Sequence, residues 1–240
     1  MSYFLDFAND SKKLSLASSF GRYRWEESDN YTEKVKECIS RFSAVSVRES
    51  SGVAICRDVF GIEASCVIDP TIAWKNYGDL IKKQPKNQIA CFVLNVKNPL
   101  FCKLVDSLAD NTKLEVLVLD YGSGLKYRSL RTCEKSPIRW LDEIYNSEII
   151  ITDSFHGVAF SLIFKKQFFV ICADEKKFSR IESLLKKVGL EERVVSSNED
   201  LNNRLQHLLS PIDYQYADKV LEEERNNYFH FVNTNISGKQ

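Results

Sequence analysis

The sequence has little of several features that mark particular classes of protein. Its 33 Lys and Arg residues balance 33 Asp and Glu residues, so the formal net charge is zero. Without an excess of positive charge, nothing indicates a nucleic-acid-binding protein or a protein held on an anionic membrane by charge. The longest apolar runs are far shorter than the ~20 residues of a membrane-spanning helix, so we expect no transmembrane segment.

The N-terminus lacks the marks of an export signal, and the cysteines lack the marks of a metal site. Residues 1–13 have neither a basic start nor a continuous apolar core, so we expect a cytoplasmic protein. There are seven cysteines and only three histidines, with no C-x-x-C pair. Because structural zinc needs clustered Cys and His, no metal is predicted, and the cysteines are expected to be reduced and mostly buried.

The sequence does have a repeated alternation of short β-rich runs and amphipathic helical stripes. Continuous apolar strands separated by helices are typical of parallel sheets covered on both faces, as in Rossmann-like folds. We therefore predict an α/β protein with two Rossmann-like lobes. The predicted strands cover residues 14–17, 44–47, 64–68, 89–94, 114–119, 149–151, 168–171 and 194–195.

A polar segment around Pro85 divides the two series of strands. Residues 1–84 are predicted to form a partial N-terminal lobe and residues 88–209 a C-terminal lobe. Helix 212–232 is expected to pack back on the first lobe. With only three convincing strands, this first lobe is expected to be incomplete, and pairing in a homodimer would cover its exposed sheet edge.

The most informative segment, residues 148–171, predicts a strand, a polar turn, a helix and a second strand. In open parallel sheets, ligands bind at the carboxyl ends of strands, where such a turn lies. His156 at the helix start suits a general acid or a phosphate ligand, and Gly157 would allow close approach of a ligand or backbone. Ser154 or Asp153 would cap the helix, and Ser154 can also donate to phosphate. The alternative is a histidine that only caps or packs.

Other candidate residues follow the first two strands. Arg48 can hold phosphate or carboxylate with a bidentate fork, and Glu49 can pair with it or orient it. Taken alone, this pattern favours a surface ion pair at a helix start. Ser19 and Gly21 suit contacts with a sugar or phosphate, but a plain turn explains them as well.

Three further features have simpler interpretations. Asp69 before Pro70 favours a helix-capping turn. The glycine-containing loop 121–124 follows a strand and is placed to line a cleft, but it matches no phosphate-binding fingerprint. His207 and His230 lie in helical segments with no constellation of polar site residues nearby, which favours surface or capping positions.

Four segments together resemble the polysaccharide pyruvyl transferase family. In order, they are SLASSFG (15–21), FSAVSVRESSG (42–52), VIDPT (67–71) and IIITDSFHGVAFSLIFKKQFFVI (149–171). The resemblance implies a two-lobed fold like that of GT-B glycosyltransferases, with the active cleft between the lobes. It also implies transfer of pyruvate from phosphoenolpyruvate to two hydroxyls of a sugar, which forms a cyclic ketal and releases phosphate without a metal or cofactor.

The resemblance also implies roles for individual residues. By correspondence, His156 is the acid that protonates the enolpyruvate methylene and steadies phosphate, and Arg48 is an anion clamp. Both would act after lobe closure. The implied partners are a small-molecule donor and a glycan acceptor, with peripheral contact to a lipid-linked glycan, and no nucleic acid.

The sequence departs from the family pattern in two places. Many members have Arg-Leu-His where this chain has Ser154, Phe155 and His156. Anion binding would then depend on Arg48, the helix N-terminus and a lysine such as Lys165 or Lys166. Family members also usually begin with another strand, glycine-rich loop and helix, which we do not find here.

Two other functions stay open. One is a nucleotide-sugar glycosyltransferase, which usually places a carboxylate near the donor ribose in its second lobe; the sequence offers no clear residue for that role. The other is a non-catalytic or degenerate family member, an alternative that the short first lobe favours. It predicts that replacing His156 changes no measurable function.

Overall fold

The computed structural model describes residues 2–8, 11–119, 131–132, 136–172, 174–175 and 178–236, so loop 121–124 lies outside the described residues. Contacts divide the chain into two compact units. Unit 1 comprises Met1–Ala73, Glu175–Val188 and Lys219–Gln240, and unit 2 comprises Trp74–Asp174 and Gly189–Asp218. The helical segment at 178–188 thus groups with unit 1, whereas the sequence pattern grouped it with the second lobe. An amphipathic stripe shows that one helix face is buried, but not against which sheet.

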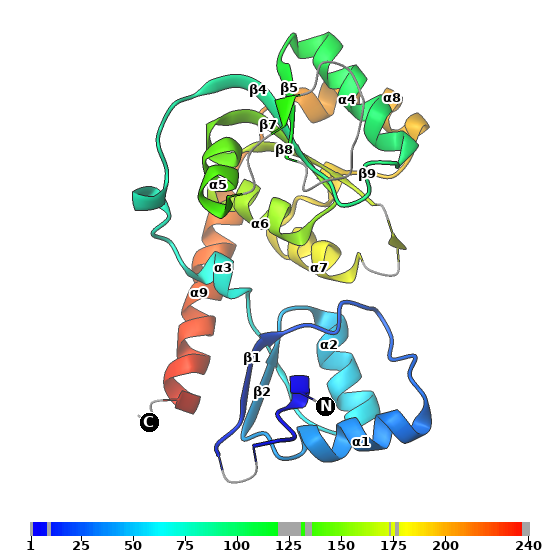
Figure 1. Cartoon of the computed structure of the whole chain (residues 1–240), viewed down its shortest axis with the longest axis vertical. Coiled ribbons are helices and arrows are strands. Elements are labelled where there is room, and N and C mark those ends of the chain that lie inside the picture. The colour runs from blue at the N-terminus through cyan, green and yellow to red at the C-terminus, as the bar shows by residue number, and fades with distance from the viewer. Residues whose placement is uncertain are drawn as a thin grey trace. The chain divides into compact units, whose positions relative to one another are not determined.

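Unit 1 is built on a parallel sheet in the order β1-β2-β3 (Figure 1). Its strands are β1 (Leu14–Ser18), β2 (Ala44–Val47) and β3 (Ser65–Cys66). Its helices are η1 (Ser2–Phe4), α1 (Asp29–Ile39), α2 (Ser50–Ile55), the π-helical η2 (Cys56–Phe60), α3 (Pro70–Ala73) and α7 (Ser179–Val188). Helix α9 (Gln215–Ile236) begins in unit 2 and continues in unit 1.

A small apolar core holds unit 1 together. Val45 and Val47 of β2 pack with Val35 and Ile39 of α1 and with Phe60 of η2. These side chains recur at helical spacing in α1 and follow one another closely in β2, as expected for elements that face one core. The carboxyl ends of β1 and β2 are thereby held side by side, because the two strands run parallel.

Unit 2 contains a six-stranded parallel sheet in the order β6-β5-β4-β7-β8-β9. The strands are β4 (Lys86–Phe92), β5 (Glu115–Val118), β6 (Arg131–Thr132), β7 (Ser147–Thr152), β8 (Gln167–Ile171) and β9 (Val194–Val195). Helices α4 (Pro99–Thr112), α5 (Pro137–Asn146), α6 (Phe155–Ile163) and α8 (Asn198–Leu209) flank it, with short η3 (Gly78–Leu80) and η5 (Glu191–Arg193).

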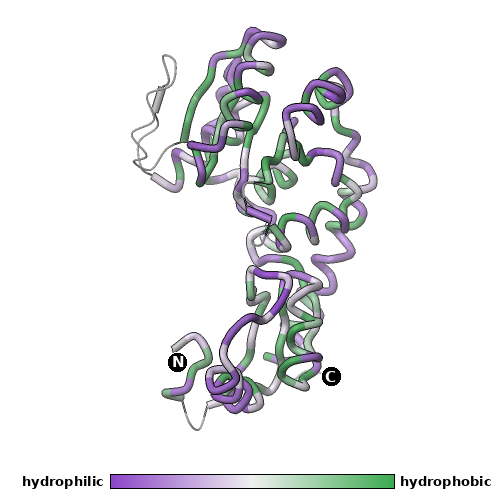
Figure 2. The backbone as a smooth tube through the Cα atoms, turned by 90° about the vertical axis from the view of Figure 1, so that its right-hand side faces the viewer, coloured by the Kyte–Doolittle hydropathy of each residue, from purple (hydrophilic) through white to green (hydrophobic). Residues whose placement is uncertain are grey.

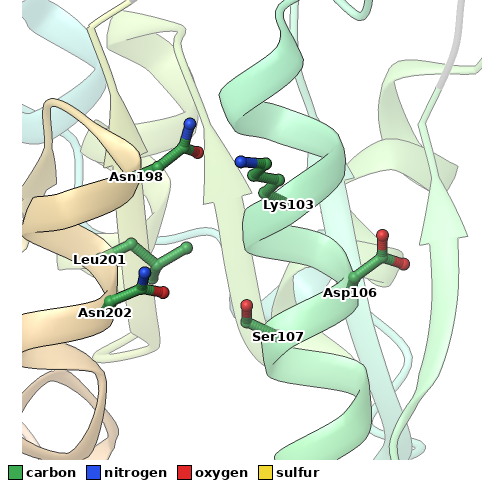
Figure 3. A pocket seen from close by; sticks show the side chains of 6 residues that line it. All are labelled: Lys103, Asp106, Ser107, Asn198, Leu201 and Asn202. Atoms are coloured by element: carbon green, nitrogen blue, oxygen red, sulfur yellow. The ribbon is translucent and has the colours of Figure 1, made fainter.

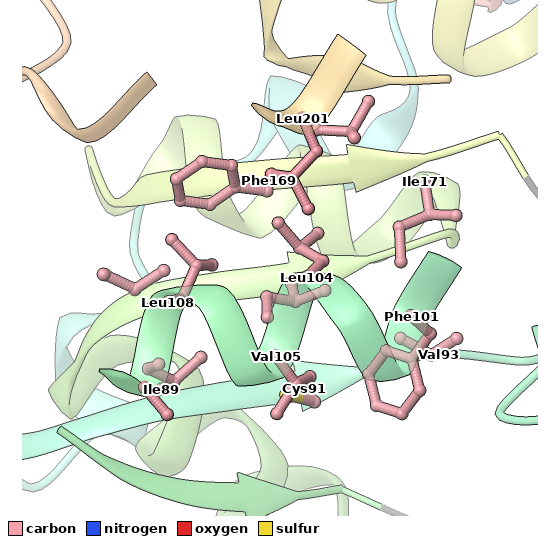
Figure 4. Packing of buried hydrophobic residues seen from close by; sticks show 14 of the residues in the cluster. Ile89, Cys91, Val93, Phe101, Leu104, Val105, Leu108, Phe169, Ile171 and Leu201 are labelled. Carbon is pink, nitrogen blue, oxygen red and sulfur yellow. The ribbon is translucent and has the colours of Figure 1, made fainter. Parts of the chain in front are cut away.

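The main core of unit 2 lies between this sheet and helices α4 and α8. Figure 4 shows side chains of α4, such as Leu104 and Leu108, pointing toward Ile89 of β4 and Phe169 of β8. Each fully buried side chain of this kind contributes about 1.5–3 kcal/mol relative to exposure. In both units the helices carry hydrophobic and hydrophilic segments in turn (Figure 2), as amphipathic helices that cover sheets do.

The structure confirms the predicted α/β class with parallel sheets flanked by helices. The sequence of residues 74–83 weakly predicts a helix, and this prediction is wrong, because the chain there forms only the short η3, preceded by the single turn α3. The two-residue strand β6 was not predicted. Among the described residues, no helix has the length and apolar character needed to cross a membrane.

Candidate functional site

In unit 1, the side chain of Glu49 holds the loop that follows β1. Its Oε1 accepts hydrogen bonds from the Ser19 hydroxyl at 2.9 Å, the Phe20 N–H at 2.8 Å and the Gly21 N–H at 3.1 Å. Glu49 is fully buried, and its Oε2 has no hydrogen-bond partner among the described residues. Gly21 has a φ of +67°, a conformation that suits glycine and completes this tight turn. Glu49 therefore shapes a loop that contains two predicted substrate-binding residues.

Arg48, the residue before Glu49, forms an ion pair with Asp69. The Arg48 N–H donates to the Ser18 carbonyl, which aligns the residue with the end of β1. Its Nη1 donates to Asp69 Oδ2, and 16% of the Arg48 side chain stays exposed. Asp69 Oδ1 accepts from the Thr71 N–H at 2.9 Å, so the predicted capping turn is confirmed.

These contacts set the protonation of Asp69. Burial raises the pKa of Asp69, but hydrogen bonds from Thr71 and Arg48 outweigh that effect and hold the pKa below its usual value. Asp69 is therefore a carboxylate at neutral pH, and the Arg48 guanidinium is oriented at the carboxyl end of β2.

Arg180, in the first turn of α7, lies beside the same loop. A Cβ placed on Gly21 would be 3.9 Å from Arg180 Nε and 3.9 Å from Ser19 Oγ. Burial and then the positive charge of Arg48 lower the pKa of Arg180 from its usual value, while nearby carboxylates oppose this. Arg180 could not be singled out from the sequence, because nothing in an amphipathic stripe distinguishes one polar position from another.

A cavity of about 570 Å³ in unit 1 begins at this loop. Ser18, Ser19 and Phe20 line it at the end of β1, and Trp25 and Tyr31 line it further on. The Trp25 and Tyr31 rings stack with centroids 6.1 Å apart. The loop held by Glu49 therefore borders a space with hydroxyl and aromatic groups on its walls.

In unit 2, Gly157 allows α6 to begin directly against β7. A Cβ at Gly157 would lie only 2.1 Å from Thr152 Oγ1, so no other residue fits without displacing that side chain. Thr152 Oγ1 donates to the Phe92 carbonyl at 2.7 Å and accepts from the Ser154 N–H at 3.0 Å. The close approach that the sequence predicted at Gly157 is thus made by the Thr152 side chain.

Asp153 does not cap α6. Its two carboxylate oxygens accept from the Leu94 N–H at 2.7 Å and the Asn95 N–H at 3.0 Å, which fastens the loop after β4 to the end of β7. This arrangement corrects the capping role considered for Asp153. The contact joins residues 58 and 59 positions apart, so local sequence could not indicate it.

Ser154 and His156 lie at the start of α6. Ser154 is the N-cap residue with extended backbone, as predicted, but its side chain forms no capping hydrogen bond and is buried. The His156 side chain is exposed, and its ring meets that of Phe155 edge-on at 5.6 Å. Exposure at the carboxyl end of β7 makes the imidazole accessible to a ligand. The assigned substrate-binding and catalytic roles stay predictions.

The lysines proposed as supporting cations lie at the other end of α6. Lys165 Nζ pairs with Asp218 at 2.5 Å, and Lys166 Nζ lies 5.3 Å from the centre of the Tyr145 ring. Helix α6 spans Phe155–Ile163, so these lysines follow its C-terminus, while His156 lies in its first turn. With a rise of about 1.5 Å per residue, the two ends are too far apart for shared contact with one phosphate.

Unit 2 also has a small groove between α4 and α8, of about 160 Å³ (Figure 3). Lys103, Asp106 and Ser107 line it from α4, and residues of α8, including Asn198 and Asn202, line it from the other side. None of the predicted site residues lines this groove, so it does not enter the candidate site.

The described residues offer little for metal or thiol chemistry. Within the ranges given above, no group of three or more His, Cys, Asp or Glu side chains is placed to hold a metal ion. Cys38, Cys56 and Cys91 are buried, and burial with the nearby charge of Glu49 raises the pKa of Cys56 to about 11. A buried thiol with so high a pKa is a poor nucleophile at neutral pH.

A family model for polysaccharide pyruvyl transferases matches residues 2–171, more than half of the chain. The chain belongs to the polysaccharide pyruvyl transferase family. The matched range includes both the Arg48–Glu49 pair and the β7–α6 segment with His156. This membership confirms the resemblance drawn from the sequence. No curated protein matches the chain.

Solved structures with similar shape come from enzymes of several activities. A glycotransferase of kitacinnamycin has a TM-score of 0.48 at 14% identity, covering 83% of this chain and 57% of its own. The Methanocaldococcus jannaschii UDP-GlcNAc 2-epimerase has a TM-score of 0.49 at 13% identity, and the match covers 81% of this chain and 62% of the epimerase. The H444N variant of the wall teichoic acid polymerase TagF has a TM-score of 0.42 at 15% identity, and the match covers 94% of this chain and 61% of TagF. This chain thus spans less than two thirds of each of these three proteins, and such scores assign no activity.

Proposed function

We propose that this protein transfers pyruvate from phosphoenolpyruvate to two hydroxyls of a sugar in a surface polysaccharide or its precursor, forming a cyclic ketal. The proposal rests chiefly on the family match over residues 2–171, which includes His156, Arg48 and Glu49. We further propose a cytoplasmic enzyme that needs no metal or organic cofactor. It would meet a lipid-linked glycan acceptor only peripherally.

The reaction requires one acid and stabilisation of an anionic donor. A proton adds to the methylene carbon of phosphoenolpyruvate, which makes C2 electrophilic, and a sugar hydroxyl then bonds to C2 with loss of its proton. The C2–O bond to phosphate breaks, and phosphate leaves with one proton. The second hydroxyl bonds to C2 and releases its proton, so protons balance and the products are the ketal and inorganic phosphate.

His156 is the proposed acid. Its exposed imidazole at the start of α6 supports this role, because a general acid must reach the carbon that it protonates. After the hydroxyls lose their protons, the imidazole can be reprotonated for the next turnover. The first turn of α6 adds backbone N–H groups, which favour a phosphate nearby.

Arg48 is the proposed anion ligand, and Glu49 is proposed to act through the loop it holds. The Asp69 pair fixes the Arg48 guanidinium while part of the side chain remains exposed, which supports contact with phosphate or carboxylate. Glu49 is buried under Ser19 and Gly21, so we assign it positioning of that loop rather than direct contact with substrate.

The test is phosphate release from phosphoenolpyruvate in the presence of candidate sugars with paired hydroxyls, together with calorimetric binding of phosphoenolpyruvate. We expect saturable binding and acceptor-dependent release. If neither is observed, while a nucleotide-sugar raises the unfolding temperature, the glycosyltransferase alternative replaces the proposal. If His156→Ala changes no measurable function, the protein is a non-catalytic family member. A homodimer stays a prediction, which sedimentation would test.

A further inference from the structure

Unit 1 brings two arginines to the same end of its small sheet. Arg48 follows β2, and Arg180 comes from α7, more than 130 positions later in the chain. The charge of Arg48 acts on Arg180, and Glu49 and Asp69 act on it as well, so the four groups form one cluster. Asp69 already pairs with Arg48, and an anionic ligand would add a further acceptor for the guanidinium groups of this cluster.

The space above Gly21 is where this cluster meets the loop. The Arg180 guanidinium and the Ser19 hydroxyl lie on the same side of Gly21, each 3.9 Å from where a Cβ would be. Gly21 also donates its N–H to Glu49, so the loop backbone cannot shift without breaking that bond. A cation, a hydroxyl and a fixed backbone thus surround one position.

The start of α7 provides a second, independent observation. Ser179, next to Arg180, is 2% exposed, and its Oγ has no hydrogen-bond partner among the residues that the structure describes. A buried hydroxyl without a partner is costly, and the first turn of a helix of this length carries partial positive charge. Ser179 and the N-terminus of α7 are therefore suited to bind an anionic oxygen.

From this arrangement we infer that Arg180 is a second ligand for the donor, binding anionic oxygens of phosphoenolpyruvate together with Arg48 over Gly21. The inference rests on the proposed function and extends it to a residue outside the predicted site.

The experiment compares Arg180→Gln and Arg180→Lys with the unmodified chain by calorimetry. The probes are phosphoenolpyruvate, inorganic phosphate and pyruvate, which separate phosphate recognition from carboxylate recognition. Arg57→Gln is the matched control, since Arg57 lies in the same unit, is 63% exposed and pairs with its neighbour Asp58. Thermal unfolding of each variant checks that it folds, and Arg180→Lys keeps the charge and most of the side-chain volume.

We expect Arg180→Gln to raise the Kd for phosphoenolpyruvate at least about tenfold, as loss of a charge-assisted contact does. Arg180→Lys should recover part of the affinity, because lysine restores the charge but not the fork. Arg57→Gln should bind like the unmodified chain.

The outcomes separate the inference from the proposed function. If phosphoenolpyruvate is turned over, but the Kd of Arg180→Gln for it is within twofold of that of the unmodified chain, the inference about Arg180 is wrong and the proposed function stands. If phosphate binding depends on Arg180 and no pyruvate is transferred, the anion site stands and the proposed function fails. If the unmodified chain binds none of the three anions, both are overturned.

Discussion

The Ser19 hydroxyl donates a 2.9 Å hydrogen bond to Glu49 Oε1, and this contact joins the carboxyl ends of β1 and β2. The same oxygen also accepts two backbone N–H groups of the loop. Three donors on one buried carboxylate oxygen make the loop depend on a single side chain. The predicted substrate-binding role of Ser19 and Gly21 therefore requires Glu49 to be in place.

Glu49→Ala should destabilise the protein by about 3 kcal/mol, because three partly buried donors lose a charged acceptor. Glu49→Gln keeps an acceptor oxygen, so it should lower the free energy of unfolding by less, at most about 1.5 kcal/mol. Urea unfolding measures both, and Glu63→Ala, at an exposed position of the same unit, is the control. Equal stability of Glu49→Ala and the unmodified chain would show that the loop does not depend on Glu49.

Gly157→Ala should destabilise the protein by about 2 kcal/mol. The new Cβ would lie 2.1 Å from Thr152 Oγ1, and the overlap outweighs the gain of about 1 kcal/mol in helix propensity. Gly78→Ala in the same unit, where a Cβ meets nothing within 4 Å, should change stability by under about 0.5 kcal/mol. Indistinguishable denaturation midpoints for the two variants would contradict the packing described here.

Asp69 should make stability depend on pH in the acid range. Its folded-state pKa lies below the usual value of 3.8, so its contribution is fully present above pH 3.8 and is lost as the pH falls through the lower folded value. The difference in unfolding free energy between the unmodified chain and Asp69→Asn should therefore shrink from pH 5 toward pH 3.

Urea unfolding across that range measures this difference, with Glu63→Gln as the comparison for an exposed carboxylate of unit 1. A gap between the unmodified chain and Asp69→Asn that stays constant or widens on acidification would contradict the assigned ion pair with Arg48.

The sequence predicted those features that depend on local pattern. Strand β2 was predicted with its observed bounds, Ala44–Val47, because a short β-rich run there is bounded by polar residues. Ser197 precedes the leucine stripe of residues 201–209, a pattern that predicts a helix cap, and its side chain accepts from the Asp200 N–H at the start of α8. The helix predicted at 74–83 was wrong, since a weak stripe does not decide between a helix and an irregular segment.

The site was harder to predict because its contacts are long-range. Glu49 was considered as a partner of Arg48, but its acceptor oxygen binds a loop 28–30 positions earlier. Arg180 gave no signal at all, because only the tertiary fold places it beside Gly21.

The most direct test of the proposed function follows ¹³C-labelled phosphoenolpyruvate into a sugar ketal by NMR. His156→Gln removes the proposed acid at an exposed position, and His207→Gln, also exposed and in unit 2, is the matched control. Loss of a general acid typically slows a reaction by about 10²–10⁴-fold. We predict ketal formation by the unmodified chain and by His207→Gln, and a loss of at least about 100-fold in His156→Gln. Absence of ketal with the unmodified chain, or an unchanged rate in His156→Gln, would contradict the account.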